Sequence, residues 1–150
     1  GWALARSNTL GEFAIRNLLA GTLPILDAEK AAEGWDGDFY RVYARAGAET
    51  AGPRQTLYVW ATTFDTQQDA REFREAFAQV LAERIGFEPQ DVTELRALPN
   101  DHWGRGWLSN ECLTAVLGRG NDVWVLSGIP EKAFPAVLEK ARQLTRQEKK

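Results

Sequence analysis

The stretch from residue 34 to residue 81 constrains the fold of this chain most strongly. It contains two segments, 39–44 and 56–64, that are rich in aromatic and β-branched residues and bounded by glycine and proline, as strands are. The polar segment between them, 47–55, is longer than a two-residue hairpin turn and is typical of a mobile hairpin loop. We therefore expect two antiparallel strands joined by this loop.

A helix is predicted directly after the second strand, because apolar residues then recur at spacings of three and four. Asp65 or Thr66 can cap its N-terminus. Each buried phenylalanine stabilises a fold by roughly 1.5–3 kcal/mol, so we expect Phe73 and Phe77 to hold this helix to the sheet. The predicted buried face consists of Ala70, Phe73, Phe77, Val80 and Leu81.

Side chains alternate between two faces along both predicted strands. We expect the aliphatic set to face the helices and the aromatic set to lie away from the central helix, where it can line a ligand groove or a docking surface. The alternative is that the irregular segment 85–110 folds over the aromatic set as a second small core. The predicted binding residues are Tyr43, Tyr58, Trp60, Phe64, Trp103 and Trp107.

The order strand, turn, strand, helix occurs twice, at 38–84 and again at 111–145, where residues 118–122 form the turn. Two such units predict an α+β fold with two layers: an antiparallel sheet of four or more strands, with helices on one face. Further helices are expected at 10–20, opened by a capping box of Thr9 and Glu12, and at 28–33.

Length and composition limit the classes of function that the chain can have. A chain of 150 residues has the length of one domain, and a net charge of −3, from 18 basic and 21 acidic residues, does not favour nucleic acid as a partner. No apolar run approaches the roughly 20 residues of a membrane span. Because the chain lacks methionine and begins with glycine, we expect a fragment or C-terminal domain of a longer protein.

The chain carries few residues suited to catalysis or metal binding. Cys112 is the single cysteine, which excludes an intrachain disulfide, and His102 is the single histidine. His102 is either a general base or metal ligand oriented by Asp101, or a loop histidine packed beside tryptophans. Asp36 and Asp38 resemble part of a calcium loop, but the remaining oxygen ligands are missing. We therefore expect no catalytic residue, no metal and no cofactor.

A resemblance is carried by Leu10-Gly11-Glu12, by Gly34-Trp35-Asp36-Gly37-Asp38, and by Trp60 followed by Asp65, Asp69-Ala70 and Phe73. Over residues 9–81 the chain resembles the C-terminal region of large uncharacterised bacterial and archaeal proteins that are predicted to be exported or attached to the envelope. The resemblance implies a domain of a longer extracytoplasmic protein, in some cases predicted to be related to peptidases. It implies no catalytic residue.

The sequence thus favours a non-catalytic module, structural or binding a ligand or a protein, whose partner is the rest of its own parent chain or another protein. The alternative is a peptidase-like hydrolase, which requires Asp36, Asp38 and His102, with Glu12 as a possible fourth member, to converge in one pocket.

Overall fold

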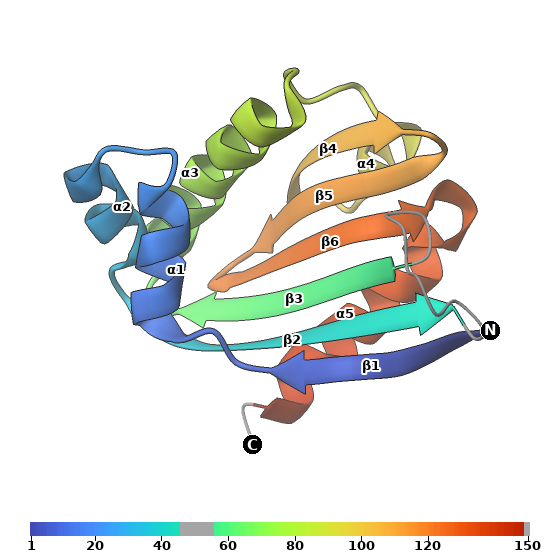
Figure 1. Cartoon of the computed structure of the whole chain (residues 1–150), viewed down its shortest axis with the longest axis horizontal. Coiled ribbons are helices and arrows are strands. Elements are labelled where there is room, and N and C mark those ends of the chain that lie inside the picture. Colours follow the sequence, from blue (N-terminus) through green and yellow to red (C-terminus); the bar gives the residue numbers. More distant parts are fainter. Residues whose placement is uncertain (46–55, 149–150) are drawn as a thin grey trace.

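The computed structural model describes the backbone of residues 1–45 and 56–148, with side chains through residue 143. This part of the chain forms one antiparallel sheet of six strands in the order β1-β2-β3-β6-β5-β4 (Figure 1). The predicted loop 47–55 lies outside the described residues. The strands are β1 (Trp2–Asn8), β2 (Trp35–Arg45), β3 (Thr56–Phe64), β4 (Trp103–Ser109), β5 (Cys112–Arg119) and β6 (Asp122–Pro130).

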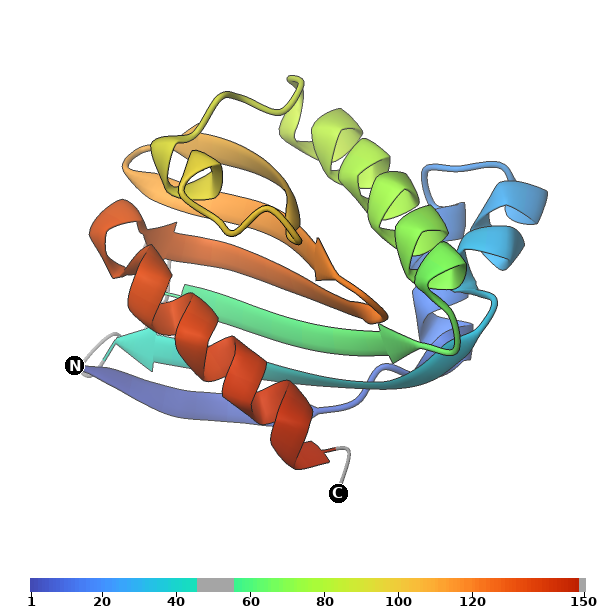
Figure 2. The ribbon, with the colours of Figure 1, turned by 180° about the vertical axis from the view of Figure 1, so that it is seen from behind.

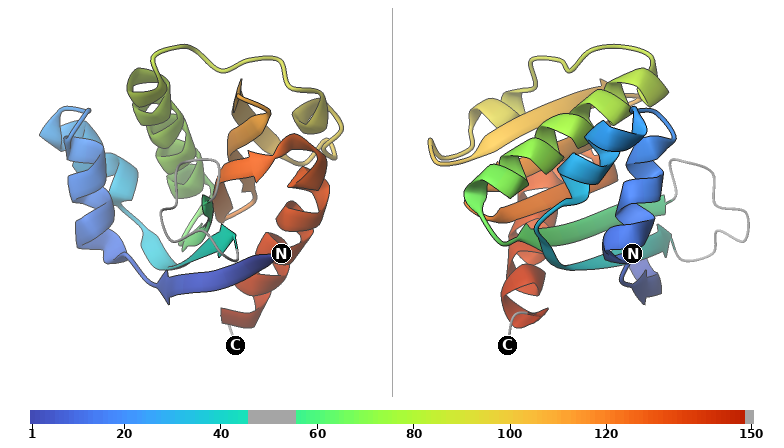
Figure 3. Two further views of the ribbon diagram at one scale, coloured as in Figure 1. Left: turned by 45° about the vertical axis from the view of Figure 1, so that its right-hand side comes forward. Right: turned by 90° about the vertical axis from the view of Figure 1, so that its left-hand side faces the viewer.

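Helices cover both faces of the sheet (Figures 1 and 2). On one face lie α1 (Gly11–Ala20), α2 (Ile25–Ala32) and α3 (Gln67–Ile85), and on the other lie α4 (Thr93–Arg96) and α5 (Phe134–Glu148), which follows the short 3₁₀ helix η2 (Glu131–Ala133). Figure 3 shows α3 and α5 on opposite sides of the strands. The mixed α and β content and the antiparallel sheet are confirmed, whereas the prediction of helices on one face is wrong.

The central strand β3 explains why helices cover both faces of the sheet, because it buries side chains on both of its own faces. Val59 and Trp60 point to opposite sides, yet they are only 5% and 7% exposed. A strand that is apolar on both faces needs a cover on each. The predicted order of strand, strand and helix does occur twice along the chain, as β2, β3, α3 and as β5, β6, α5. The two helices, however, lie on opposite faces of the sheet.

The core beneath α3 is aromatic. The Trp60 ring meets the Phe73 ring edge-on, with centroids 5.7 Å apart, and the Phe64 and Phe73 centroids are 4.9 Å apart. Phe77 completes the cluster, 5.4 Å from Trp60. The prediction that the aromatic face of β3 lies away from the central helix is therefore wrong, since aromatic rings of strand and helix pack on each other.

The core beneath α5 contains the aliphatic side chains of β3, together with residues of β5 and β6. Phe134, Leu138 and Ala141 of α5 are buried against this set. Helix spacing places these three residues on one side of α5, which ends the second predicted unit, 111–145.

Two strands fall in segments for which the sequence predicted none. β1 pairs with β2 at one edge of the sheet, and β4 pairs with β5 at the other. At the β4 edge, Gln90 takes the place of a further strand: its N–H donates to the Gly106 carbonyl at 2.8 Å, and its side-chain oxygen accepts from Leu108 N–H. The segment 85–110 is therefore more regular than expected.

Candidate functional site

The structure does not gather the six predicted binding residues onto one surface. Trp60, Phe64 and Trp107 are buried, and the Trp107 indole donates to the Phe87 carbonyl at 2.9 Å. Tyr58 is 49% exposed on the face that α3 covers elsewhere. Three of these four residues therefore lie in the core, and Tyr58 lies on an open part of the sheet.

Trp103 is half-buried beside α3, at the start of β4. The guanidinium groups of Arg74 and Arg105 lie over its ring, 4.9 and 4.7 Å from the centroid. Burial, and then the neighbouring charge of Arg71, lower the pKa of Arg74 below its ordinary value. The indole therefore already has cationic partners within the chain.

Asp38 has a structural role, and it contacts other residues that carry the resemblance described above. Its carboxylate accepts from the backbone N–H groups of Leu10 and Gly11 at 2.8 and 2.9 Å, and from the Trp60 indole at 3.0 Å. The carboxylate thereby satisfies N–H groups at the start of α1, so the predicted capping box of Thr9 and Glu12 is wrong: α1 has no side-chain hydrogen bond from its own N-cap residue.

Gly34 belongs to the same structural unit. Its φ is +75°, a conformation that glycine adopts without strain, and a Cβ at this position would collide with the Asp69 carboxylate. Asp69 in turn donates its N–H to the Thr66 hydroxyl, which caps α3 as the sequence predicted. The motif around residues 34–38 thus joins α1, β2, β3 and α3.

Asp38 and His102 are not brought together. Asp38 lies in β2, and His102 directly precedes β4. Three strands lie between β2 and β4, which corresponds to about 19 Å at the usual strand spacing. Asp38 bonds to groups on the α3 side, whereas His102 contacts α5. Asp36 is exposed in an irregular pair between β2 and β3, and no polar side-chain contact joins it to His102 among the described residues.

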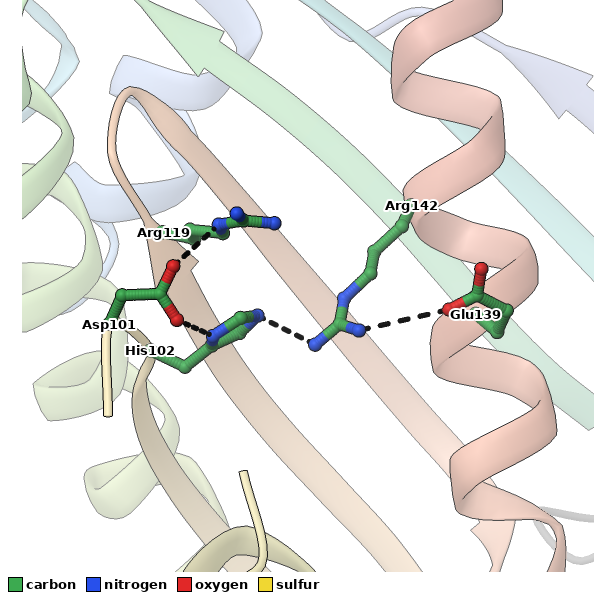
Figure 4. Close-up of polar contacts among 5 residues, drawn as sticks. All are labelled: Asp101, His102, Arg119, Glu139 and Arg142. Atoms are coloured by element: carbon green, nitrogen blue, oxygen red, sulfur yellow. Dashed lines mark hydrogen bonds and ion pairs between the residues drawn. The ribbon is translucent and has the colours of Figure 1, made fainter. Parts of the chain in front are cut away.

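His102 instead belongs to a polar network between the sheet and α5 (Figure 4). Its side chain is only 2% exposed, and Nδ1 lies 2.8 Å from an Asp101 oxygen. Nε2 lies 2.6 Å from Nη2 of Arg142 on α5. Arg119, at the end of β5, forms an ion pair with the other Asp101 oxygen at 2.9 Å, and Glu139 lies 3.8 Å from Arg142.

This geometry assigns the protons of the imidazole ring. Arginine only donates, so Nε2 of His102 accepts from Arg142 and Nδ1–H donates to Asp101. The lone pair that a general base would use is therefore engaged within the chain. The hydrogen bond from His102, and then the charge of Arg119, hold the pKa of Asp101 below its ordinary value of 3.8. The arrangement fastens α5 to the β4 and β5 side of the sheet.

An apolar pocket of about 170 Å³ lies on the other side of α5, above β1, β2 and β3. A cavity of about 150 Å³ is large enough for benzene, so this pocket accommodates one apolar group of similar size. Among the predicted binding residues only Tyr43 lines it. The lining consists of Trp2, Tyr43, Leu57, Val59, Val137, Lys140 and Ala141.

Cationic side chains lie at this pocket and on the neighbouring part of β2. Lys140 lines it, the Arg45 guanidinium lies over the Trp2 ring at 5.7 Å, and the Arg41 guanidinium lies over the Phe39 ring at 5.2 Å. In the part of the chain that the structure describes, none of these three cations has a carboxylate within 4.0 Å. Sequence reasoning missed the site because its residues come from four separate elements.

Within residues 1–45 and 56–148, no three histidine, cysteine, aspartate or glutamate side chains are grouped as metal ligands. No helix in these ranges is long and apolar enough to cross a membrane.

These features define a class of mixed α and β domain: one six-stranded antiparallel sheet, helices on both faces, and an apolar pocket beside the C-terminal helix. The chain belongs to the family described as a domain of unknown function (DUF8575), whose model matches residues 3–138. No curated protein and no solved structure has significant similarity to the chain.

Proposed function

We propose that this chain is a non-catalytic module that binds another protein, by accepting one apolar side chain of that partner in the pocket between α5 and strands β1–β3. The observation that carries the proposal is the pocket itself, which is apolar, open to solvent and lined by two partly exposed aromatic residues, Trp2 and Tyr43.

The volume of the pocket favours a single side chain of a protein partner over a whole small-molecule ligand. Ligand sites usually have volumes of about 300–1,000 Å³, so a pocket of 170 Å³ suits a single anchoring side chain. Tyrosine, tryptophan and arginine are also the residues that contribute most to protein interfaces, and Trp2, Tyr43 and Arg45 occur together here.

The test is a titration of methyl-labelled protein with N-acetyl-L-phenylalaninamide, a neutral probe that carries one aromatic side chain. We expect shifts of the Leu57, Val59 and Val137 methyl signals, with a Kd on the order of millimolar for so small a probe. Because a larger side chain at position 137 fills the pocket, Val137→Phe removes these shifts.

The matched control is Ala136→Phe, which adds an aromatic ring to the exposed side of the same helix. This variant should respond to the probe as the unmodified chain does. The proposal is contradicted if the pocket methyl signals do not respond, or if both variants respond equally.

We also propose that the module belongs to a larger extracytoplasmic protein. The resemblance of residues 9–81 to exported and envelope-attached proteins supports this location. Fractionation of cells that express the full-length parent protein should find it outside the cytoplasm, and recovery from the cytoplasm alone would contradict the proposal.

A further inference from the structure

We infer that the partner segment is acidic: it places an apolar side chain in the pocket and a carboxylate beside Lys140, Arg45 and Arg41. This inference rests on the proposed function, because it assigns the chemistry of the group that enters the same pocket.

Three cations without carboxylate partners are the main observation. Lys140 extends from α5 into the pocket lining, while Arg45 and Arg41 stand on β2 on either side of Tyr43, with side chains on the same face. Nε of Arg41 is buried without a hydrogen-bond acceptor. Lys140 and Arg45 are exposed, so an incoming carboxylate reaches them directly, whereas the buried Nε of Arg41 is out of its reach.

The surrounding face offers no intramolecular alternative among the described residues. The other side chains that β1, β2 and β3 direct toward α5 are apolar, aromatic or hydroxyl-bearing. Glu139 of α5 lies near Arg142 in the His102 network instead. A chain with a net charge of −3 therefore carries a locally positive surface around its apolar pocket.

The guanidinium groups of Arg45 and Arg41 stack on Trp2 and Phe39, and this stacking orients the two groups. Stacking does not neutralise their positive charges. The N–H groups of Arg45, which is exposed, remain available to a carboxylate at the pocket rim. An aromatic or aliphatic residue next to glutamate, aspartate or a chain terminus matches this arrangement of apolar pocket and cations.

The experiment compares N-acetyl-L-phenylalaninate with N-acetyl-L-phenylalaninamide, which differ only in the charged group. In low salt the carboxylate should bind about two- to fivefold more tightly, as expected for an exposed ion pair. The double variant Lys140→Gln, Arg45→Gln should reduce this preference, and the triple variant that adds Arg41→Gln should bring the two affinities to the same value. The ratio of the two affinities is the readout, because Lys140 also lines the pocket. Lys30→Gln, on the opposite side of the sheet, serves as the charge control.

A second arm uses the peptide acetyl-Glu-Glu-Phe-Glu-Glu-amide, which should bind more tightly than the single amino acid. Three results overturn the inference: equal affinity for carboxylate and amide, a preference that survives the triple variant, or exclusion of the peptide while the single acid binds, which would indicate a site for small acids. Concentration-dependent shifts without any probe would indicate a second copy of the chain instead. If neither probe shifts the pocket methyl signals, the proposed function itself fails.

Discussion

Asp38 makes more distinct structural contacts than any other acidic residue described above, since one carboxylate joins α1, β2 and the Trp60 indole. Its neighbour Asp36 is exposed and contributes none of these bonds. Two aspartates separated by one glycine therefore differ in role, and this difference can be measured.

Replacement of Asp38 with alanine should lower the free energy of unfolding by about 2–4 kcal/mol, because it removes a helix cap and leaves the Trp60 indole without its acceptor. Asp36→Ala should change it by less than about 0.5 kcal/mol. Urea denaturation of the two variants checks this, and equal losses would show that Asp38 has no special role.

The Asp101 and His102 pair gives a pH prediction. A lowered carboxyl pKa contributes stability above the ordinary pKa of aspartate, and this stability is lost as pH falls through the lowered value. Asp101→Asn should therefore be less stable than the unmodified chain at neutral pH, and the difference should shrink under acid conditions. Thermal denaturation across the pH range measures it, and a difference that grows with acidification would refute the assignment.

At the scale of elements, the sequence predicted β2, β3, α3 and α5 because their periodicity is local. The face assignment failed because β3 is buried on both sides, so alternation between Val59 and Trp60 does not reveal which side meets which helix. β1 escaped prediction because most of its side chains are exposed. The pocket could not be predicted, since Trp2, Tyr43 and Val137 are far apart in sequence and meet only when α5 packs on the sheet.

Packing of α3 on β3 predicts a large contrast between two neighbouring aromatic residues. Trp60→Ala should cost about 3–5 kcal/mol of stability, because it leaves a cavity against Phe73 and Phe77. Tyr58→Ala, two positions earlier on the same face of the strand, should cost less than about 1 kcal/mol. Comparable losses on chemical denaturation would contradict the observed packing.

The junction of α4 and η2 adds a pH effect of opposite sign. The Glu94 carboxylate raises the pKa of Glu131 above its ordinary value of 4.5, by repulsion between the two charges. The folded state therefore loses stability as pH rises through this raised pKa. Glu131→Gln should stabilise the chain at neutral pH and have little effect in acid, whereas Glu29→Gln should not show this pH dependence in melting temperature. A neutral-pH loss in the first variant would argue against the repulsion.

At the scale of the whole molecule, the two sides of α5 have different structural roles. One side is fastened to the sheet through Arg142 and His102, which orients the helix. The other side forms the wall of the apolar pocket. Because α5 packs over β3 and β6, the same helix carries the His102 contact and the wall of the pocket.

A crystal structure of the chain with N-acetyl-L-phenylalaninate tests the central claim most directly. We predict the phenyl ring between Trp2 and Val137, with the carboxylate within about 4 Å of Lys140 or Arg45, the usual reach of an ion pair. Density for the probe elsewhere on the molecule, with this pocket empty, would contradict the account.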